Sequence, residues 1–199
     1  GDCEISATVE IIVPEDPCIG LSAGTLPISE PHYVCFGDKV GGIDPVFAEN
    51  SSVKEGYVLG YILQDAEGTS LAYSSTDANF AFGEITNAEY NIEYVVSAVV
   101  GTDDGNGNVD FAGECIFYSD SVSVVFLEEI ILTTNILCDS NEEFFVEVSA
   151  EGGLPGYLPN TELYEIEANG ETFGKNESIE VGPFGSDELV EIEVVDGNS

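Results

Sequence analysis

Positive charge is nearly missing from this sequence. Its 199 residues include no arginine and only three lysines, against 39 acidic residues, which gives a formal net charge of -36. Nucleic acids and anionic membrane surfaces attract basic proteins, so this charge argues against both as partners. Such a chain is expected to attract cations.

The sequence also lacks long apolar runs, Cys-x-x-Cys motifs and a histidine cluster. No window reaches the roughly 18 to 20 apolar residues that span a membrane, so we expect no direct membrane insertion. The first residues do not form a signal peptide, and any export signal is expected upstream or removed. The single histidine, His32, has no Cys-x-x-Cys pair to share a zinc ion with and no nucleophile to activate.

What the sequence contains, along nearly its whole length, is β-strand pattern. Short runs rich in Val, Ile, Tyr and Phe, such as 56–63, 90–100 and 142–150, alternate apolar with polar residues. Gly, Pro, Asn and Asp separate the runs, and no stretch predicts a convincing helix. With 43% hydrophobic residues, the chain can bury one or two cores. We therefore predict an all-β protein of tandem immunoglobulin-like antiparallel β-sandwiches.

Two junctions divide the chain. The stretch VEIIVPEDPC is a strand that stops at two prolines before a cysteine, whereas VSVVFLEEIILTTNILC reads as one strand that runs unbroken into the next cysteine. The opening GDCEISATVEIIV also resembles GECIFYSDSVSVVFL, as two copies of the same junction between repeats would. The predicted parts are 1–16, the last strand of an upstream repeat or an exchanged strand, plus a linker; 17–129, a sandwich; and 130–199, a second, shorter sandwich.

Five widely spaced cysteines favour disulfides and an oxidising, extracellular compartment. Cys35 opens an early strand and Cys115 precedes the last strand of its unit, and a sandwich can bring such positions within the roughly 4.4 to 6.8 Å between Cα atoms that a disulfide needs. We expect this pair, with two buried free thiols as the alternative. Cys3 is expected to pair with Cys18 or with an upstream cysteine. Cys138 is expected to pair beyond the end of this sequence.

The loop GTDDGNGNVDFAGE is the candidate cation site. It places oxygen-bearing side chains at alternate positions, as Ca²⁺ prefers, although the EF-hand pattern fails at both of its ends. Turn chemistry at a hairpin tip accounts for the same residues, and weak, charge-driven cation binding is a third alternative. Apart from Ca²⁺ we expect no cofactor. The candidate ligands are Asp103, Asp104, Asn106, Asn108 and Asp110.

Two other groups of side chains have a catalytic or binding interpretation. Neighbouring carboxylates could serve glycoside hydrolysis, but on alternating strands they are expected to form solvated faces. Tyrosines could form a sugar-stacking platform, but core or corner packing is the better expectation. The carboxylates are Glu128 with Glu129, Glu142 with Glu143, and Glu162 with Glu165 and Glu167; the tyrosines are Tyr57, Tyr61, Tyr157 and Tyr164.

Several short motifs occur in a specific order along the chain. Residues 17–129 contain an Ala-Gly-Thr-Leu stretch, a Cys-x-Gly-Asp turn, a Gly-Tyr-x-x-x-Tyr strand and a late cysteine, and residues 138–199 contain FFVEVSAEGGLPGY and close on VEIEVVDGNS. This order resembles the sandwich repeats of very large Bacteroidetes cell-surface proteins, the SprB-type gliding-motility adhesins and related type IX secretion cargo. The resemblance implies a structural or adhesive role without catalytic residues.

Three positions match modification patterns. Asn50 and Asn176 lie in N-glycan acceptor sequences. Ser121 lies in Asp-Ser-Val, which resembles the short O-glycosylation motif of Bacteroidetes exported proteins. All three are predicted glycosylation sites.

These features predict a non-enzymatic structural or adhesive repeat segment of a large extracellular adhesin or fibre at the cell surface. Its expected partners are like domains of the same chain or fibre, together with glycans or surfaces. One sign of charge on rigid sandwiches keeps such an array extended. Two alternatives stay open: a self-assembling extracellular filament subunit joined by strand exchange or disulfides, and a carbohydrate-binding module of a secreted enzyme.

Overall fold

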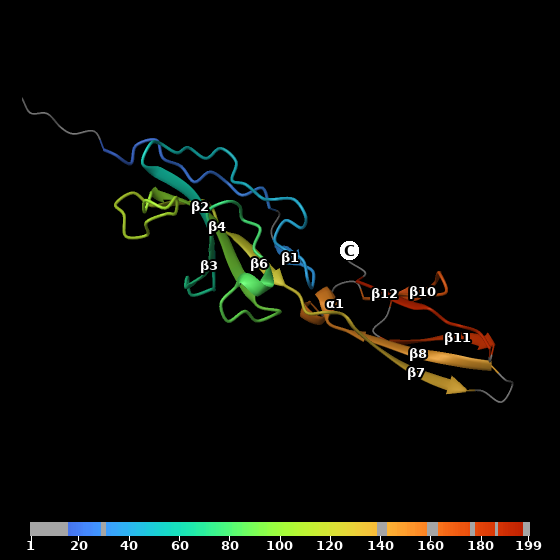
Figure 1. The fold of residues 1–199 in the computed structure, drawn as a ribbon. Coiled ribbons are helices and arrows are strands. Elements are labelled where there is room, and N and C mark those ends of the chain that lie inside the picture. Colours follow the sequence, from blue (N-terminus) through green and yellow to red (C-terminus); the bar gives the residue numbers. More distant parts are fainter. Residues whose placement is uncertain are drawn as a thin grey trace, which may run out of the picture.

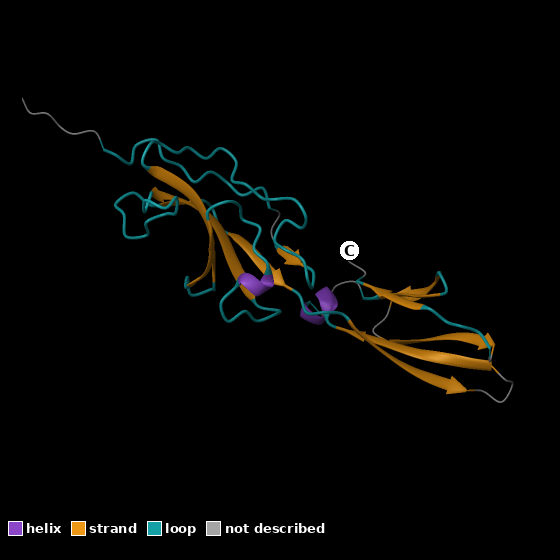
Figure 2. Ribbon diagram, viewed as in Figure 1, coloured by secondary structure: helices purple, strands orange, loops and turns teal. Residues whose placement is uncertain are grey.

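The structure, a computed structural model, contains two β-rich units that follow one another along the chain (Figures 1 and 2). Strands dominate both units, so the predicted all-β class is confirmed. In Figure 1 the short helix α1 (Gly153–Tyr157) lies where the first unit meets the second. The described residues are 16–28, 31–138, 143–158, 163–175, 178–185 and 187–196.

The first unit is built on one twisted sheet with the strand order β1-β6-β4-β2-β3, and β5 pairs with the far end of β4. All its pairs are antiparallel except β1 with β6. The central strand β4 is rich in Val and Ala and buried along most of its length, as a strand covered on both faces should be. The elements are β1 (His32–Val34), β2 (Tyr57–Gln64), β3 (Ser70–Ser74), the 3-10 turn η1 (Phe82–Glu84), β4 (Glu93–Thr102), β5 (Phe117–Tyr118) and β6 (Val122–Phe126).

A ribbon made of residues 21–28 and 46–53 packs on one face of this sheet. The side chains that it buries belong to the same apolar cluster as those of β2, β4 and β6. The Tyr61 hydroxyl on β2 accepts a hydrogen bond from the Ala48 N–H at 3.1 Å, which ties the ribbon to the sheet. Two isolated antiparallel bridges hold the ribbon together, Ser22 to Ser52 and Thr25 to Glu49.

A tyrosine corner, a hallmark of immunoglobulin-like sandwiches, fixes the start of β4. The Tyr94 side chain is only 1% exposed. Its hydroxyl donates to the Glu89 carbonyl at 2.8 Å and accepts from the Glu89 N–H at 2.7 Å. The ring lies edge-on to Phe126 of β6, with 5.9 Å between the ring centroids. The turn before β4 is thus anchored to the core, and the immunoglobulin-like class is shown by this feature together with the antiparallel sheets.

The second unit is a sandwich of two three-stranded antiparallel sheets, β11-β8-β7 and β10-β9-β12. On β9 the side chains of Ile166 and Ala168 are buried, whereas Glu165 and Glu167 alternate with them on the outer face. This alternation is the period-2 pattern that the sequence shows. The strands are β7 (Ile131–Cys138), β8 (Glu143–Glu151), β9 (Glu165–Ala168), β10 (Glu171–Lys175), β11 (Ser178–Gly185) and β12 (Ile192–Val195).

The stretch 122–138 does not form the single strand that the sequence predicts. It forms β6 and β7, separated by residues 127–130. Leu127 N–H still donates to a carbonyl of β1 at 2.9 Å, but Glu128 N–H already bonds the Asn91 side chain at 3.3 Å, so the chain leaves the first sheet here. The apolar run is continuous because the buried residues of β6 are followed closely by the apolar residues of β7, an exposed strand of the second unit.

Helices play a small part in the described chain. The prediction of no helix is corrected by α1, a single turn of five residues within the GGLPGY segment. None of the helices among the described residues is both long and apolar enough to cross a membrane.

Replacing Tyr94 by Phe should destabilise the first unit by about 1 to 3 kcal/mol, because it leaves a backbone N–H and a carbonyl without their buried partner. Urea-induced unfolding of the intact chain measures the change. Tyr118→Phe is the matched control, since Tyr118 is 51% exposed and should change stability little. Equal effects of the two substitutions would contradict the anchoring role of the corner.

Candidate functional site

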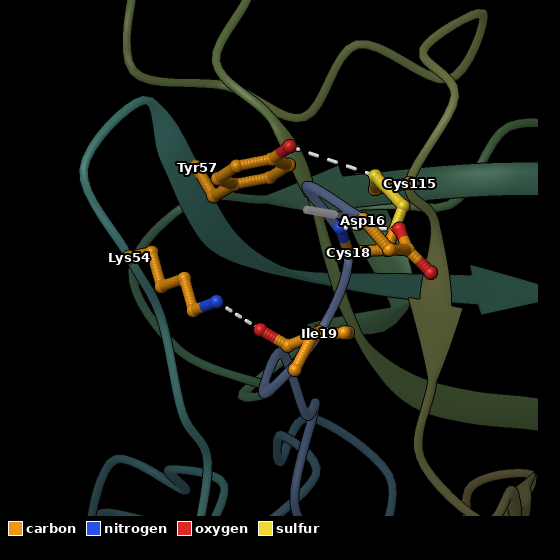
Figure 3. Close-up of a disulfide and its surroundings, with 6 residues drawn as sticks. All are labelled: Asp16, Cys18, Ile19, Lys54, Tyr57 and Cys115. Atoms are coloured by element: carbon orange, nitrogen blue, oxygen red, sulfur yellow. Dashed lines mark hydrogen bonds between the residues drawn. A yellow bond between two sulfur atoms is a disulfide. The ribbon is translucent and has the colours of Figure 1, made fainter. Parts of the chain in front are cut away.

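A disulfide between Cys18 and Cys115 closes the first unit at the end where the described chain begins (Figure 3). The two Cα atoms are 5.4 Å apart and the sequence separation is 97 residues. Cys115 is buried, and the Tyr57 hydroxyl donates to its Sγ at 3.5 Å. A loop of this length should stabilise the unit by about 4 to 5 kcal/mol through the lost entropy of the unfolded chain.

Two hydrogen bonds hold the segment around Cys18 in place. The Asp16 carboxylate accepts from the Cys18 N–H at 2.9 Å, and the Lys54 ammonium donates to the Ile19 carbonyl (Figure 3). One of the three lysines of the chain is therefore used to fix the entry of the ribbon. The segment enters the unit with its backbone already bonded on both sides of the disulfide.

The predicted disulfide between Cys35 and Cys115 is wrong. Cys35 directly follows β1, which pairs with β6 beside the first residues of β4. Cys115 lies near the other end of β4, where its carbonyl would be 3.6 Å from a Cβ added to Gly101. Because β4 has ten residues at about 3.3 Å each, its two ends are roughly 30 Å apart. The two cysteines therefore lie at opposite ends of the sheet.

The other two cysteine predictions concern Cys3 and Cys138. The pair Cys3–Cys18 is excluded because Cys18 already bonds Cys115. Cys3 itself lies outside the described residues. Cys138 is an exposed free thiol at the end of β7, and its pairing beyond this sequence stays a prediction.

Cys35 is an exposed free thiol at the boundary between the units. Partial burial raises the pKa of this thiol, and the negative charges of Asp38 and Asp196 raise it further. Asp196 follows β12 of the second unit, so both units contribute to the environment of the thiol. Since the thiolate is the reactive form of a cysteine, a raised pKa lowers the fraction of Cys35 in that form.

The acidic hairpin loop between β4 and β5 uses its carboxylates to build turns. Each accepts hydrogen bonds from backbone N–H groups two or four residues further on, and these bonds lower the pKa of Asp104. This is the turn chemistry that the sequence offered as an alternative to Ca²⁺. No group of three or more His, Cys, Asp or Glu side chains in the described ranges is placed to hold a metal ion, and Ca²⁺ binding stays a prediction. The acceptor and donor residues are Asp103 with Gly105 and Gly107, Asp104 with Asn106 and Asn108, and Asp110 with Ala112.

The singled-out tyrosines form no exposed platform. Tyr61 and Tyr164 are buried, and Tyr57 and Tyr157 are half-buried. The expected core or corner packing is confirmed for Tyr57, Tyr61 and Tyr164, which belong to the two apolar clusters or pack against them. His32 lines an open hollow of about 440 Å³, and burial lowers its pKa. The described lining of this hollow contains no serine, threonine or cysteine, and the interpretation of His32 as an ordinary residue stays a prediction.

Of the carboxylates considered for hydrolysis, those on β9 lie on its outer face, as predicted. Glu142 and Glu162 lie outside the described residues. Asn50 is exposed in a turn with φ 56°, and Ser121 is exposed just before β6, so both are accessible to modification. Asn176 lies outside the described residues, and glycosylation of all three stays a prediction.

The two units contact one another through residues 127–130 and 152–157. This contact is called the joint. Gly153 N–H donates to the Glu128 carbonyl at 3.1 Å. Gly152 has φ 91°, and a Cβ there would lie 2.1 Å from the Glu129 carbonyl oxygen. Only glycine fits this approach. The linker between β6 and β7 is thus clasped by the segment that follows β8.

Three further contacts complete the joint. The buried Tyr164 hydroxyl donates to the Gly152 carbonyl at 2.6 Å, and the Asp196 carboxylate after β12 accepts from the Leu154 N–H at 2.8 Å. Tyr33 of β1 and Tyr157 of α1 have ring centroids 6.1 Å apart. The joint therefore contacts both units. The GGLPGY motif marked it in the sequence, but only as a turn.

Removing the disulfide by replacing Cys18 and Cys115 with alanine should destabilise the first unit by about 4 to 5 kcal/mol. Urea unfolding measures the loss, and peptide mapping without reduction should recover the peptide pair that contains Cys18 and Cys115. Cys35→Ala is the control and should change stability little, because Cys35 is exposed and unbonded. A mapped Cys35–Cys115 pair would contradict the structure.

Replacing Gly152 by Ala should destabilise the second unit by about 2 kcal/mol, because the residue has a positive φ and the added methyl meets the Glu129 carbonyl. The midpoint of urea unfolding measures the effect. Gly156→Ala, four residues on, is the matched control, since a Cβ there meets nothing within 4 Å. A Gly152→Ala protein as stable as this control would show that the joint is loose.

No protein-family model matches the chain, and no curated protein matches it. Among solved structures, that of the amphioxus IgVJ-C2 molecule matches with 13% sequence identity and a TM-score of 0.28. The match covers 74% of this chain and 91% of that chain. The immunoglobulin-like class rests on the strands and the tyrosine corner of the chain itself.

Proposed function

We propose that the chain is a non-enzymatic structural or adhesive repeat segment of a large extracellular cell-surface adhesin or fibre. The joint is the observation that carries the proposal. It connects two β-sandwich units in series through a short linker that is hydrogen-bonded to the first unit at Leu127 and Glu128 and clasped by the second at Gly153. Units connected this way keep a defined orientation, which a fibre needs and a flexible tether would not provide.

The disulfide supports an extracellular location. Bonds of this kind form and persist in oxidising environments and are rare where thiols are kept reduced. The Cys18–Cys115 bond also holds the first unit where the ribbon has only isolated bridges.

The charge supports an extended arrangement. The chain carries 39 acidic residues against three lysines, so neighbouring segments of the same kind repel one another at low ionic strength. The SprB-type identity is the finer part of the proposal. Its support is the GGLPGY motif, which occupies the joint rather than an ordinary loop.

One hollow bears on the alternative of a carbohydrate-binding module. It has a volume of about 550 Å³, lies beside the joint and is lined by Phe36, Tyr90 and three glutamates. One face of Tyr90 is already covered, since Phe82 stacks on it with ring centroids 3.7 Å apart. Phe36 is inclined to Tyr90 by 45°, so the rings offer no flat platform for a sugar. A structural or adhesive repeat therefore fits the observations better.

An antibody raised against this segment tests the proposal in the source cells. It should label intact cells, and it should detect, after reduction and denaturation, a polypeptide many times heavier than the 21.1 kDa of this chain. A band of about that mass would contradict a tandem repeat and favour a discrete subunit. Turnover of any glycoside by the purified chain would contradict the non-enzymatic role, and specific binding on a glycan array would favour the carbohydrate-binding alternative.

A further inference from the structure

The strand β7 has an open edge that carries no charge. Within the described part of the chain β7 pairs with β8 alone. All eight of its residues are exposed, including Ile136 at 64% and Ile131 at 53%. Its sequence ILTTNILC has no charged residue, in a chain where 21% of residues are charged. A long, apolar, unpaired edge of this kind is a template for another strand.

The opposite edge of the same sheet is protected in the usual ways. The strand β11 is also eight residues long, but it contains Glu180 and Pro183. Its pairing with β8 shifts register between Val181 and Phe184, which bends the strand. Charge, proline and a bulge are the devices that prevent edge-to-edge pairing. Since β11 has all three, their absence from β7 stands out within one sheet.

The sequence of β7 is complementary to itself when read in the reverse direction. In an antiparallel pair around a two-fold axis, one residue lies opposite its own copy, and the others pair symmetrically about it. With Thr134 on the axis, every apolar residue from 131 to 137 meets an apolar residue and every polar one a polar one. The opposed pairs are Ile131 with Leu137, Leu132 with Ile136, Thr133 with Asn135, and Thr134 with Thr134. With Asn135 on the axis, Thr134 would meet Ile136 and Thr133 would meet Leu137.

We propose that β7 pairs antiparallel with β7 of a second copy of this chain, which joins two three-stranded sheets into one six-stranded sheet. A second copy is the occupant that the self-complementary sequence of β7 favours. Two chains of net charge -36 repel strongly, so they approach most easily where neither carries charge. The edge offers no charge to attract a basic partner. This inference does not depend on the adhesive role, because it concerns the isolated chain.

Sedimentation of the purified chain tests the association. The dimer should strengthen with salt, because the Debye length falls from about 10 Å at 0.1 M to about 3 Å at 1 M ionic strength. Thr134→Glu should weaken the dimer about fivefold, since it places two carboxylates side by side on the axis. Ser178→Glu adds the same charge to an exposed position of β11, on the other edge of the sheet, and should weaken it much less.

Cross-linking tests the register. In a chain with Cys3, Cys35 and Cys138 replaced by serine, Thr134→Cys should form a disulfide-linked dimer, because opposed Cα atoms of a strand pair lie about 4.5 to 5.5 Å apart. Asn135→Cys is the control on the same exposed strand. Its two copies would be offset along the paired strands, so it should cross-link several-fold more slowly.

Each outcome supports or overturns the proposal. A monomer at all salt and protein concentrations would overturn it, as would a dimer that Thr134→Glu and Ser178→Glu weaken equally. Faster cross-linking at Asn135 than at Thr134 would overturn the register. Circular dichroism of every variant shows whether it is folded, and Thr134 tolerates substitution because its side chain is exposed. The antibody experiment on source cells is separate, so failure of the dimer leaves the proposed function standing.

Discussion

The covalent bond between Cys18 and Cys115 is the constraint on which the first unit depends. The sheet of this unit has an apolar face that must be covered, and the ribbon of residues 21–28 and 46–53 covers it with few backbone hydrogen bonds of its own. The disulfide fixes the start of the ribbon to the end of the sheet, and Tyr61 fixes its return. A layer that cannot form a regular sheet is thereby held in a sandwich.

Charge then determines which surfaces of the molecule can meet. Glutamates occupy the outer face of β9, and together with the other acidic residues they make close approach of two chains costly at low salt. Two surfaces described above differ from the outer face of β9: the joint, where backbone meets backbone, and the edge of β7, whose residues are uncharged. At the joint, glycine lets backbone meet backbone at Gly152 and Glu129. At β7, the apolar and neutral polar side chains leave the edge open.

The sequence predicted what depends on neighbouring residues. The period-2 alternation of apolar and polar residues is local, so the all-β class and the outward glutamates of β9 followed from it. The disulfide did not follow, because strand order says that Cys35 and Cys115 belong to one sandwich but not that they lie at opposite ends of β4. Pairing of cysteines is a three-dimensional property, and five of them allow many combinations.

The sequence did not predict the joint for a related reason. Residues 122–138 form one apolar run, yet its first part is buried in one core and its last part forms an exposed edge of the other unit. Local pattern does not distinguish one long strand from two strands that belong to different units. The glycines of GGLPGY indicated a turn, but the partner of Gly152 is the carbonyl of Glu129, 23 residues earlier in the sequence, and no local rule identifies it.

Disulfide and joint together define how the chain carries tension. A force applied between residue 18 and β7 passes through the Cys18–Cys115 bond and then along residues 116–130 into the second unit. Residues 19–114 lie inside the covalent loop, so the covalent path of the force bypasses them, although they supply β1 to β4 and most of the first core. Only β5, β6 and the linker can then extend in the first unit. A disulfide between Cys35 and Cys115 would have left the ribbon up to residue 34 outside the loop and exposed to the pull, so the observed pairing protects the least regular layer of the structure.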